Sequence, residues 1–288
     1  MLRSVGGSHR GFGLLVVSPS SLAELFPAGG YRFHLTLRRD EPAAFFRHRD
    51  GTGRLLADRV RWLSTEPARY AALLPEGVPL AEEAAALPAA WNGGSADEGP
   101  KPTAGSLIHA LGTSLEPDVL LLSPDPEGKF RLRGGAVCFA SGWALEEKLG
   151  HTVDFIHDVV PGLNAALAAP IHHFLSRLRP GVAFLRDNWG IAATGEFNLH
   201  PSRGFPPPGQ PLRLDLLWLR IEHQALVAMP GSRGILFGIR IAVHRLDAVA
   251  RDPAAAGLRR ALETMPAVVA AYKRLDAIRG DLLALLPT

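Results

Sequence analysis

The stretch that decides the fold reads AVCFASGWALEEKLG at 136–150 and HTVDFIHDVVPG at 151–162. The run at 135–139 is short and mostly apolar, which predicts a strand covered on both faces. We expect a helix over 144–149, capped by Ser141 and ended by Gly150. Thr152 can cap a further turn of helix, which carries His157 and ends before Pro161-Gly162.

His157 is the candidate metal ligand of this stretch. A histidine on such a turn can offer one ring nitrogen to an iron while a neighbour holds the other nitrogen. On spacing alone, the simpler interpretation is a histidine in the core or at its boundary whose ring nitrogens have hydrogen-bond partners. Cys138 could also ligate an iron, but its apolar strand favours a buried, inert thiol.

Elements on either side of this stretch indicate a mostly antiparallel sheet with helices. Residues 119–122 and 130–133 predict a hairpin around the turn at 123–128. Residues 163–178 predict a helix that Pro170 kinks or divides, and 182–189 predict a strand. His172 and His173 are adjacent on that helix, so they cannot both reach one metal in the way that residues one turn apart can.

The clearest hairpin joins strands at 216–226 and 235–245 through the turn at 229–234. With Gly231 at its centre, Glu222 is expected opposite Arg240, and Arg220 opposite Ala242. Arg220, Glu222 and Arg240 would then share one face of the sheet, with Glu222 and Arg240 as a cross-strand ion pair. An exposed ion network of little energetic weight is the simpler interpretation.

Both ends of the chain are expected to add helices and one strand. Residues 1–30 are a lead-in, 31–37 alternate as a strand, and 55–74 follow a helical stripe. Residues 91–102 read as an exposed loop or linker. We therefore divide the chain into an N-terminal extension with a helical portion at 1–100 and a sheet domain with C-terminal helices at 101–288. Two helices are expected at the C-terminus, beginning near Pro253 and Pro266.

Composition narrows the class of protein. The chain has 288 residues, is 47% hydrophobic and carries a formal net charge of only +3, with arginines scattered along it. That pattern speaks against a nucleic-acid surface. No apolar run reaches the length of about 20 residues that a membrane helix needs. A single cysteine suits a reducing compartment, so we expect a cytoplasmic protein without a membrane segment.

Seven blocks of this sequence resemble the haem-dependent oxidative N-demethylase alpha-subunit family, which has a PAS-like fold. They occur in the family's order, at 137–150, 156–162, 188–189, 219–226, 237–240, 265–266 and 271–275. The sequence departs from the family pattern at three positions. Gly142 and His223 stand where the family usually has arginine, and Val159 stands where it usually has proline.

The resemblance implies an α+β, PAS-like antiparallel sheet that binds haem b. The haem would be non-covalent, because the chain has no Cys-x-x-Cys-His site. His157 is implied as the iron ligand, with His151, His172 and His173 in reserve. Arg220, Glu222 and Arg240 are implied at the haem propionates, since buried carboxylates need positive partners.

The implied activity is a monooxygenase-like oxidative N-demethylation. Its substrate would be a small secondary amine such as dimethylamine, with dioxygen as oxidant and formaldehyde as product. Electrons would come from a separate flavin and iron–sulfur reductase, and a folate-binding partner would capture the formaldehyde. Two alternatives stay open: a haem-binding PAS-type sensor without turnover, and a haem-free pseudoenzyme of the same fold, which the three departures suggest.

Overall fold

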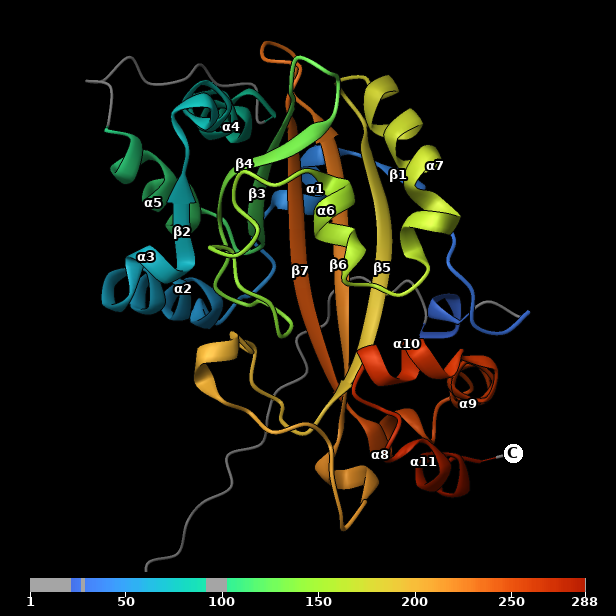
Figure 1. The fold of residues 1–288 in the computed structure, drawn as a ribbon. Helices are drawn as coiled ribbons and strands as arrows, with labels where there is room; N and C mark the ends of the chain where they lie inside the picture. Colours follow the sequence, from blue (N-terminus) through green and yellow to red (C-terminus); the bar gives the residue numbers. More distant parts are fainter. Residues whose placement is uncertain (1–21, 27–28, 92–102, 288) are drawn as a thin grey trace, which may run out of the picture.

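One antiparallel sheet of seven strands organises the computed structural model, which describes residues 22–26, 29–91 and 103–287 (Figure 1). The strands are β1 (Arg38–Asp40), β2 (Ala71–Leu73), β3 (Asp118–Pro124), β4 (Phe130–Ala136), β5 (Ala183–Ala192), β6 (Trp218–Ala228) and β7 (Ile235–Arg245). Their order across the sheet is β1-β5-β6-β7-β3-β4-β2. The predicted α+β class is confirmed.

The five long strands form the centre of this sheet. Numbered among themselves from β3 to β7, they run 2-1-5-4-3 across the sheet, as expected for a PAS-like sheet. The chain therefore leaves β4 near one edge and must cross the sheet to reach β5. It makes this crossing with α6 (Val153–Asp158) and α7 (Leu163–Arg177), which lie over one face of the strands (Figure 1).

The remaining helices lie at the two ends of the described chain. The N-terminal set is α1 (Pro42–Phe46), α2 (Arg54–Thr65), α3 (Pro67–Tyr70), α4 (Val78–Trp91) and α5 (Ala104–Ser114). The C-terminal set is α8 (Leu246–Val249), α9 (Ala255–Thr264), α10 (Ala267–Tyr272) and α11 (Arg279–Leu285). Short 3-10 turns occur at Leu22–Leu25, Pro75–Gly77, Pro201–Arg203 and Leu214–Leu216. No described helix is both long and apolar enough to cross a membrane.

Residues on both sides of the predicted boundary at 100 belong to this one sheet. The first edge strand, β1, pairs with β5, and β2 pairs with β4 at the other edge. A buried ion pair of 2.5 Å also joins Arg59 of α2 to Asp118 of β3. The segment 92–102, with the predicted linker, lies outside the described residues, as does most of the predicted lead-in.

Two apolar clusters cover the sheet. The larger one includes Leu121 and Leu236 at the centre and packs against α1, α4, α5 and α7. The smaller one gathers the lower ends of β5 to β7 with the C-terminal helices, and includes Trp189 and Leu258. Because α6 contributes no fully buried residue to either cluster, the helix that carries His157 is less tightly covered than its neighbours.

Several predicted elements are confirmed. The hairpin at 119–133 is β3 and β4, the strand at 182–189 is β5, and Thr152 caps α6 by accepting the backbone N–H of Phe155 at 3.2 Å. The helix at 163–178 is α7, which continues through Pro170 without a break. The C-terminal prediction is only partly confirmed: Asp252 accepts the backbone N–H of Ala254 at 2.8 Å, but α9 begins at Ala255, two residues after Pro253, and α11 follows the two expected helices.

Other predicted elements are wrong, for local reasons. The strand expected at 135–139 ends at Ala136. Val137 still donates its N–H to the Tyr70 carbonyl oxygen at 2.7 Å, but the N–H groups of Cys138 and Phe139 bond to the Asp118 carboxylate instead of a strand. The helix expected at 144–149 is only a turn, since the Ser141 hydroxyl accepts from Arg220 rather than capping it. The strand expected at 31–37 starts only at Arg38, and the helix expected at 55–74 is divided into α2, α3 and β2.

The long hairpin of β6 and β7 is confirmed, but its predicted register is wrong by one residue. The connection holds six residues, closed by Met229 N–H to Gly234 O at 2.8 Å, so its centre lies between Gly231 and Ser232. Glu83 of α4 holds that centre by accepting the N–H groups of Gly231 at 2.6 Å and Ser232 at 2.8 Å. A slip of one residue turns every side chain of a strand to the other face.

Candidate functional site

Polar side chains lie on the face of the sheet that α6 covers, here called the α6 face. Arg186 of β5 pairs with Gln224 of β6, and Asn188 pairs with Glu222. Paired residues of an antiparallel ladder share a face, so these four side chains stand together. Arg220 follows on the same face, two residues before Glu222.

This part of the α6 face is only partly covered. Arg186, Gln224 and Val243 are half-buried and Asn188 is exposed, although β6 and β7 are central strands. Toward β3 and β4 the same face is apolar and buried, for example at Leu120. The exposed Asn188 therefore leaves this polar region accessible to solvent, and in Figure 1 the strands β5 and β6 that carry it run from α6 toward α10.

His157 in the last turn of α6 has an unsatisfied ring. Its Nδ1 is buried without a hydrogen-bond partner among the described residues. Burial, with the nearby Arg186 guanidinium, lowers the pKa of His157 to about 4. The imidazole is therefore neutral at pH 7, which is the form that ligates a metal ion. An unpaired buried nitrogen costs free energy, so it points to a function rather than to packing.

Arg186 is the central charge of the site. Its guanidinium makes no hydrogen bond or ion pair with the described residues, although burial lowers its pKa. It lowers the pKa values of His34 and His157, second to burial in each case, and makes a smaller contribution to the lowered pKa of Lys273, after burial and the opposing Glu222. Glu222 and Asp187 are near enough to raise its pKa, but no acidic group contacts it directly among the described residues, so its donors can bind a carboxylate.

Glu222 is the acidic group beside it, and its residue is 8% exposed. Oε2 accepts from the amide groups of Gln224 at 2.9 Å and Asn188 at 3.3 Å. Oε1 has no hydrogen-bond partner among the described residues. Two amides thus fix the direction of this carboxylate and leave one oxygen free to accept.

Two tyrosines and a lysine complete the site. Burial and then the charge of Glu222 raise the pKa of Tyr272, while burial and then Tyr272 raise the pKa of Tyr31 to about 12. Lys273 donates from Nζ to the Trp189 carbonyl oxygen at 2.6 Å. Burial lowers its pKa to about 8; Glu222 opposes this shift, and Arg186 adds a smaller lowering effect.

The predicted trio of Arg220, Glu222 and Arg240 is not assembled on one face. Arg240 stands opposite His223, so it lies on the other face of the sheet from Glu222. There it forms a buried ion pair of 2.7 Å with Glu116 and donates to the carbonyl oxygens of Phe45 and Arg47. The predicted ion pair between Glu222 and Arg240 is therefore wrong.

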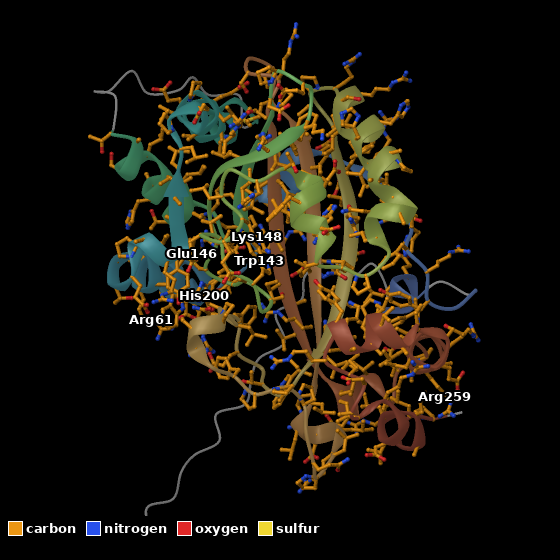
Figure 2. The ribbon with its side chains drawn as sticks, viewed as in Figure 1. Arg61, Trp143, Glu146, Lys148, His200 and Arg259 are labelled. Atoms are coloured by element: carbon orange, nitrogen blue, oxygen red, sulfur yellow. The ribbon has the colours of Figure 1, made fainter. Side chains whose placement is uncertain are left out.

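Arg220 does lie on the α6 face, but its donors are used inside the protein. It donates to Ser141 Oγ at 2.7 Å and to the carbonyl oxygens of Phe139, Glu196 and Phe197 at 2.6 to 2.9 Å. It thus holds the loop after β4. A second contact holds this loop, because the carboxylate of its residue Glu146 lies 3.3 Å from His200 Nε2. Figure 2 labels both residues, together with Trp143 and Lys148.

The other candidate iron ligands are less suitable. His151 stacks on Phe155 with ring centroids 4.0 Å apart, and His172 Nε2 lies 3.2 Å from the Gly128 carbonyl oxygen. Cys138 is buried, as predicted, and burial raises its thiol pKa to about 12, so it stays protonated. Among the described residues, no group of three or more His, Cys, Asp or Glu could hold a bare metal ion.

The three departures from the family pattern have different structural settings. Gly142 has a φ of +79°, which glycine adopts without strain and arginine does not. Val159 is exposed at the end of α6. His223 is on the face opposite Glu222, where its Nδ1 lies 2.7 Å from Asp187, which also pairs with Arg38 at 2.7 Å.

Sequence reasoning assigned no role to Arg186 or Lys273. Arg186 is the only charge on its face of the strand predicted at 182–189, and that was the available signal. Lys273 lies in the block at 271–275 that resembles the family, but its proximity to β5 depends on how α10 packs.

A comparison with known protein families agrees with this arrangement. The match covers residues 81–283, more than two thirds of the chain, and includes every strand from β3 to β7 as well as His157. The matching family is described as haem-dependent oxidative N-demethylase, alpha subunit-like. The chain belongs to this family of haem-dependent oxidative N-demethylase alpha subunit-like proteins.

Proposed function

We propose that the chain binds haem b non-covalently on the α6 face, with His157 as the iron ligand. The observation that carries this proposal is the neutral His157 ring, whose buried Nδ1 has no partner among the described residues. The family membership supplies the identity of the cofactor. The donor set fits, because one neutral imidazole suffices for a haem iron while a bare metal ion needs several ligands.

Arg186 is our candidate partner for a haem propionate. It lies close to His157, it carries positive charge, and no described acidic group neutralises it by direct contact. The propionate role predicted for Arg220 and Arg240 would require them to exchange existing hydrogen bonds. An arginine with free donors meets a new carboxylate without that cost.

The activity we propose is oxidative N-demethylation of a small secondary amine such as dimethylamine, with release of formaldehyde. Bound haem supplies the dioxygen chemistry that the protein side chains lack. Glu222 would bind the protonated amine, because its free Oε1 can accept an N–H from an ammonium group. Asn188 and Gln224 would hold the carboxylate in place during this contact.

The partners proposed for this reaction are separate proteins. Electrons would come from a flavin and iron–sulfur reductase, and a folate-binding subunit would accept the formaldehyde. The family description as alpha subunit-like supports an assembly with other subunits.

Two measurements in sequence test the proposal. Haem is first titrated into the purified chain, and a stoichiometric Soret band that is lost in His157→Ala is expected. Formaldehyde release is then measured with dimethylamine, dioxygen and a chemical reductant. Stoichiometric haem without release from any small methylamine would favour the sensor, and the absence of haem binding would favour the pseudoenzyme.

A further inference from the structure

Lys273 has an unusual position for a lysine. It follows the last residue of α10, and its amine reaches the edge of β5 at the Trp189 carbonyl oxygen. Among the described strands, β1 pairs with β5 only as far as Leu185, so no described strand pairs with this edge at Trp189. The amine also lies 5.2 Å from the centre of the Trp189 ring.

This amine is desolvated without a counter-ion. No ion pair joins it to a described carboxylate, and its one hydrogen bond goes to a neutral carbonyl group. Glu222 and Arg186 are the charges near it, and they act in opposite directions. With a pKa near 8, a sizeable fraction of the amine is neutral and nucleophilic at neutral pH.

We propose that Lys273 is an aldehyde-binding residue, which forms a reversible imine with the small aldehyde released on the α6 face. The geometry that points to it is an amine without a carboxylate contact, held at the Trp189 carbonyl of β5, one residue from Asn188, whose side chain bonds Glu222 on the α6 face. This inference rests on the proposed function, because N-demethylation is what supplies formaldehyde at this site.

The step needs no oxidant or reductant. The neutral amine attacks the aldehyde carbon, a C–N bond forms, and the carbonyl electron pair takes up a proton to give a carbinolamine. The nitrogen then expels the hydroxyl group, which leaves with a proton as water, and a C=N bond remains. Hydrolysis reverses both steps and returns the aldehyde. Glu222 and Tyr272 are the nearby groups able to carry these protons.

Reductive trapping tests the inference without haem, dioxygen or turnover. The full-length chain is pulsed with formaldehyde and cyanoborohydride at neutral pH, digested, and its N-methyl-lysines are mapped by mass spectrometry. The chain has four lysines, Lys101, Lys129, Lys148 and Lys273, so each is read separately. The lowered pKa of Lys273 increases the fraction of its amine that is neutral. A less basic amine is also a weaker nucleophile, which offsets part of the resulting increase in labelling rate. We expect Lys273 to be labelled about tenfold faster than Lys129 and Lys148.

A matched variant checks that the site causes this reactivity. Arg186→Gln removes the positive charge that helps to lower the pKa of Lys273, so labelling of Lys273 should slow severalfold while Lys129 is unaffected. Labelling of Lys273 at or below the rate of Lys129 would overturn the inference. Formaldehyde release by an enzyme whose Lys273 is not trapped would leave the proposed function standing alone. Labelling of Lys273 in a protein that releases no formaldehyde from any methylamine would support the aldehyde site but contradict the proposed N-demethylation.

Discussion

Arg186 of β5 lies close enough to His157 of α6 to lower the pKa of its imidazole, and together with burial it brings that pKa to about 4. The two groups come from the sheet and from the helix that crosses it, and neither has a hydrogen-bond partner among the described side chains. Such an arrangement destabilises a protonated His157 and leaves a neutral nitrogen donor. Both consequences can be measured.

The haem-free protein should lose stability in mild acid because of His157. The pKa is about 4 when folded and 6.5 when exposed, so the unfolded chain binds the proton more readily between these values. The contribution of the neutral His157 to the free energy of unfolding is fully present above pH 6.5. It is lost as the pH falls toward 4, and the loss amounts to up to about 3 kcal/mol. Urea unfolding at several pH values should show a clearly smaller loss in His157→Gln. An exposed control, His172→Gln, should follow the parent protein.

Arg186→Gln should separate binding from folding. Removing a desolvated, unpaired guanidinium should leave the melting temperature of the haem-free protein unchanged or raise it. The same change should weaken haem affinity about tenfold or more, if a propionate contacts this arginine. Thermal melting and haem titration are the two readouts, with the exposed Arg39→Gln as control. A large fall in melting temperature would mean that Arg186 makes a stabilising contact in the folded protein, against this prediction.

Arg240 should behave in the opposite way. It is 4% exposed and is paired with Glu116, which is 3% exposed, so Arg240→Met leaves a buried carboxylate without its partner. A loss of about 3–5 kcal/mol of unfolding free energy is expected. The double variant Arg240→Met and Glu116→Gln should recover part of it. Urea unfolding of both variants checks this. A single variant as stable as the parent would show that the ion pair is energetically unimportant.

Local patterns were enough to predict the elements that bring His157 to the sheet. The Thr152 cap, the hairpin of β3 and β4 and the strand pair of β6 and β7 depend on neighbouring residues, and all are confirmed. The register of the last pair is different, because Glu83 fixes the turn at Gly231 from a helix 148 residues away. Nothing within the hairpin sequence marks that contact.

The charged residues of the site illustrate the same limit. A strand pattern tells which arginines share a face, but it cannot tell which of them find partners. Arg240 is paired with Glu116, and Arg220 donates its hydrogen bonds to the loop around Phe139; both partners are distant in sequence. Arg186 has no such partner and was given no role beforehand. The unpaired group becomes visible only when the tertiary contacts are known.

Glu222→Gln should impair recognition of the amine while leaving haem in place. The variant keeps the size of the side chain and a carbonyl oxygen that can accept from Gln224, but it lacks the negative charge that an ammonium group needs. Losing one charge-assisted contact costs about 1.5–3 kcal/mol, which corresponds to a rise in KM of roughly ten- to a hundredfold for dimethylamine. The measurement is formaldehyde release against amine concentration, beside a haem titration of the same sample. Glu147→Gln, an exposed acid in the loop before α6, should keep the parent KM. If Glu222→Gln also keeps it, Glu222 does not bind the substrate, and its role is to balance the charges of Arg186 and Lys273.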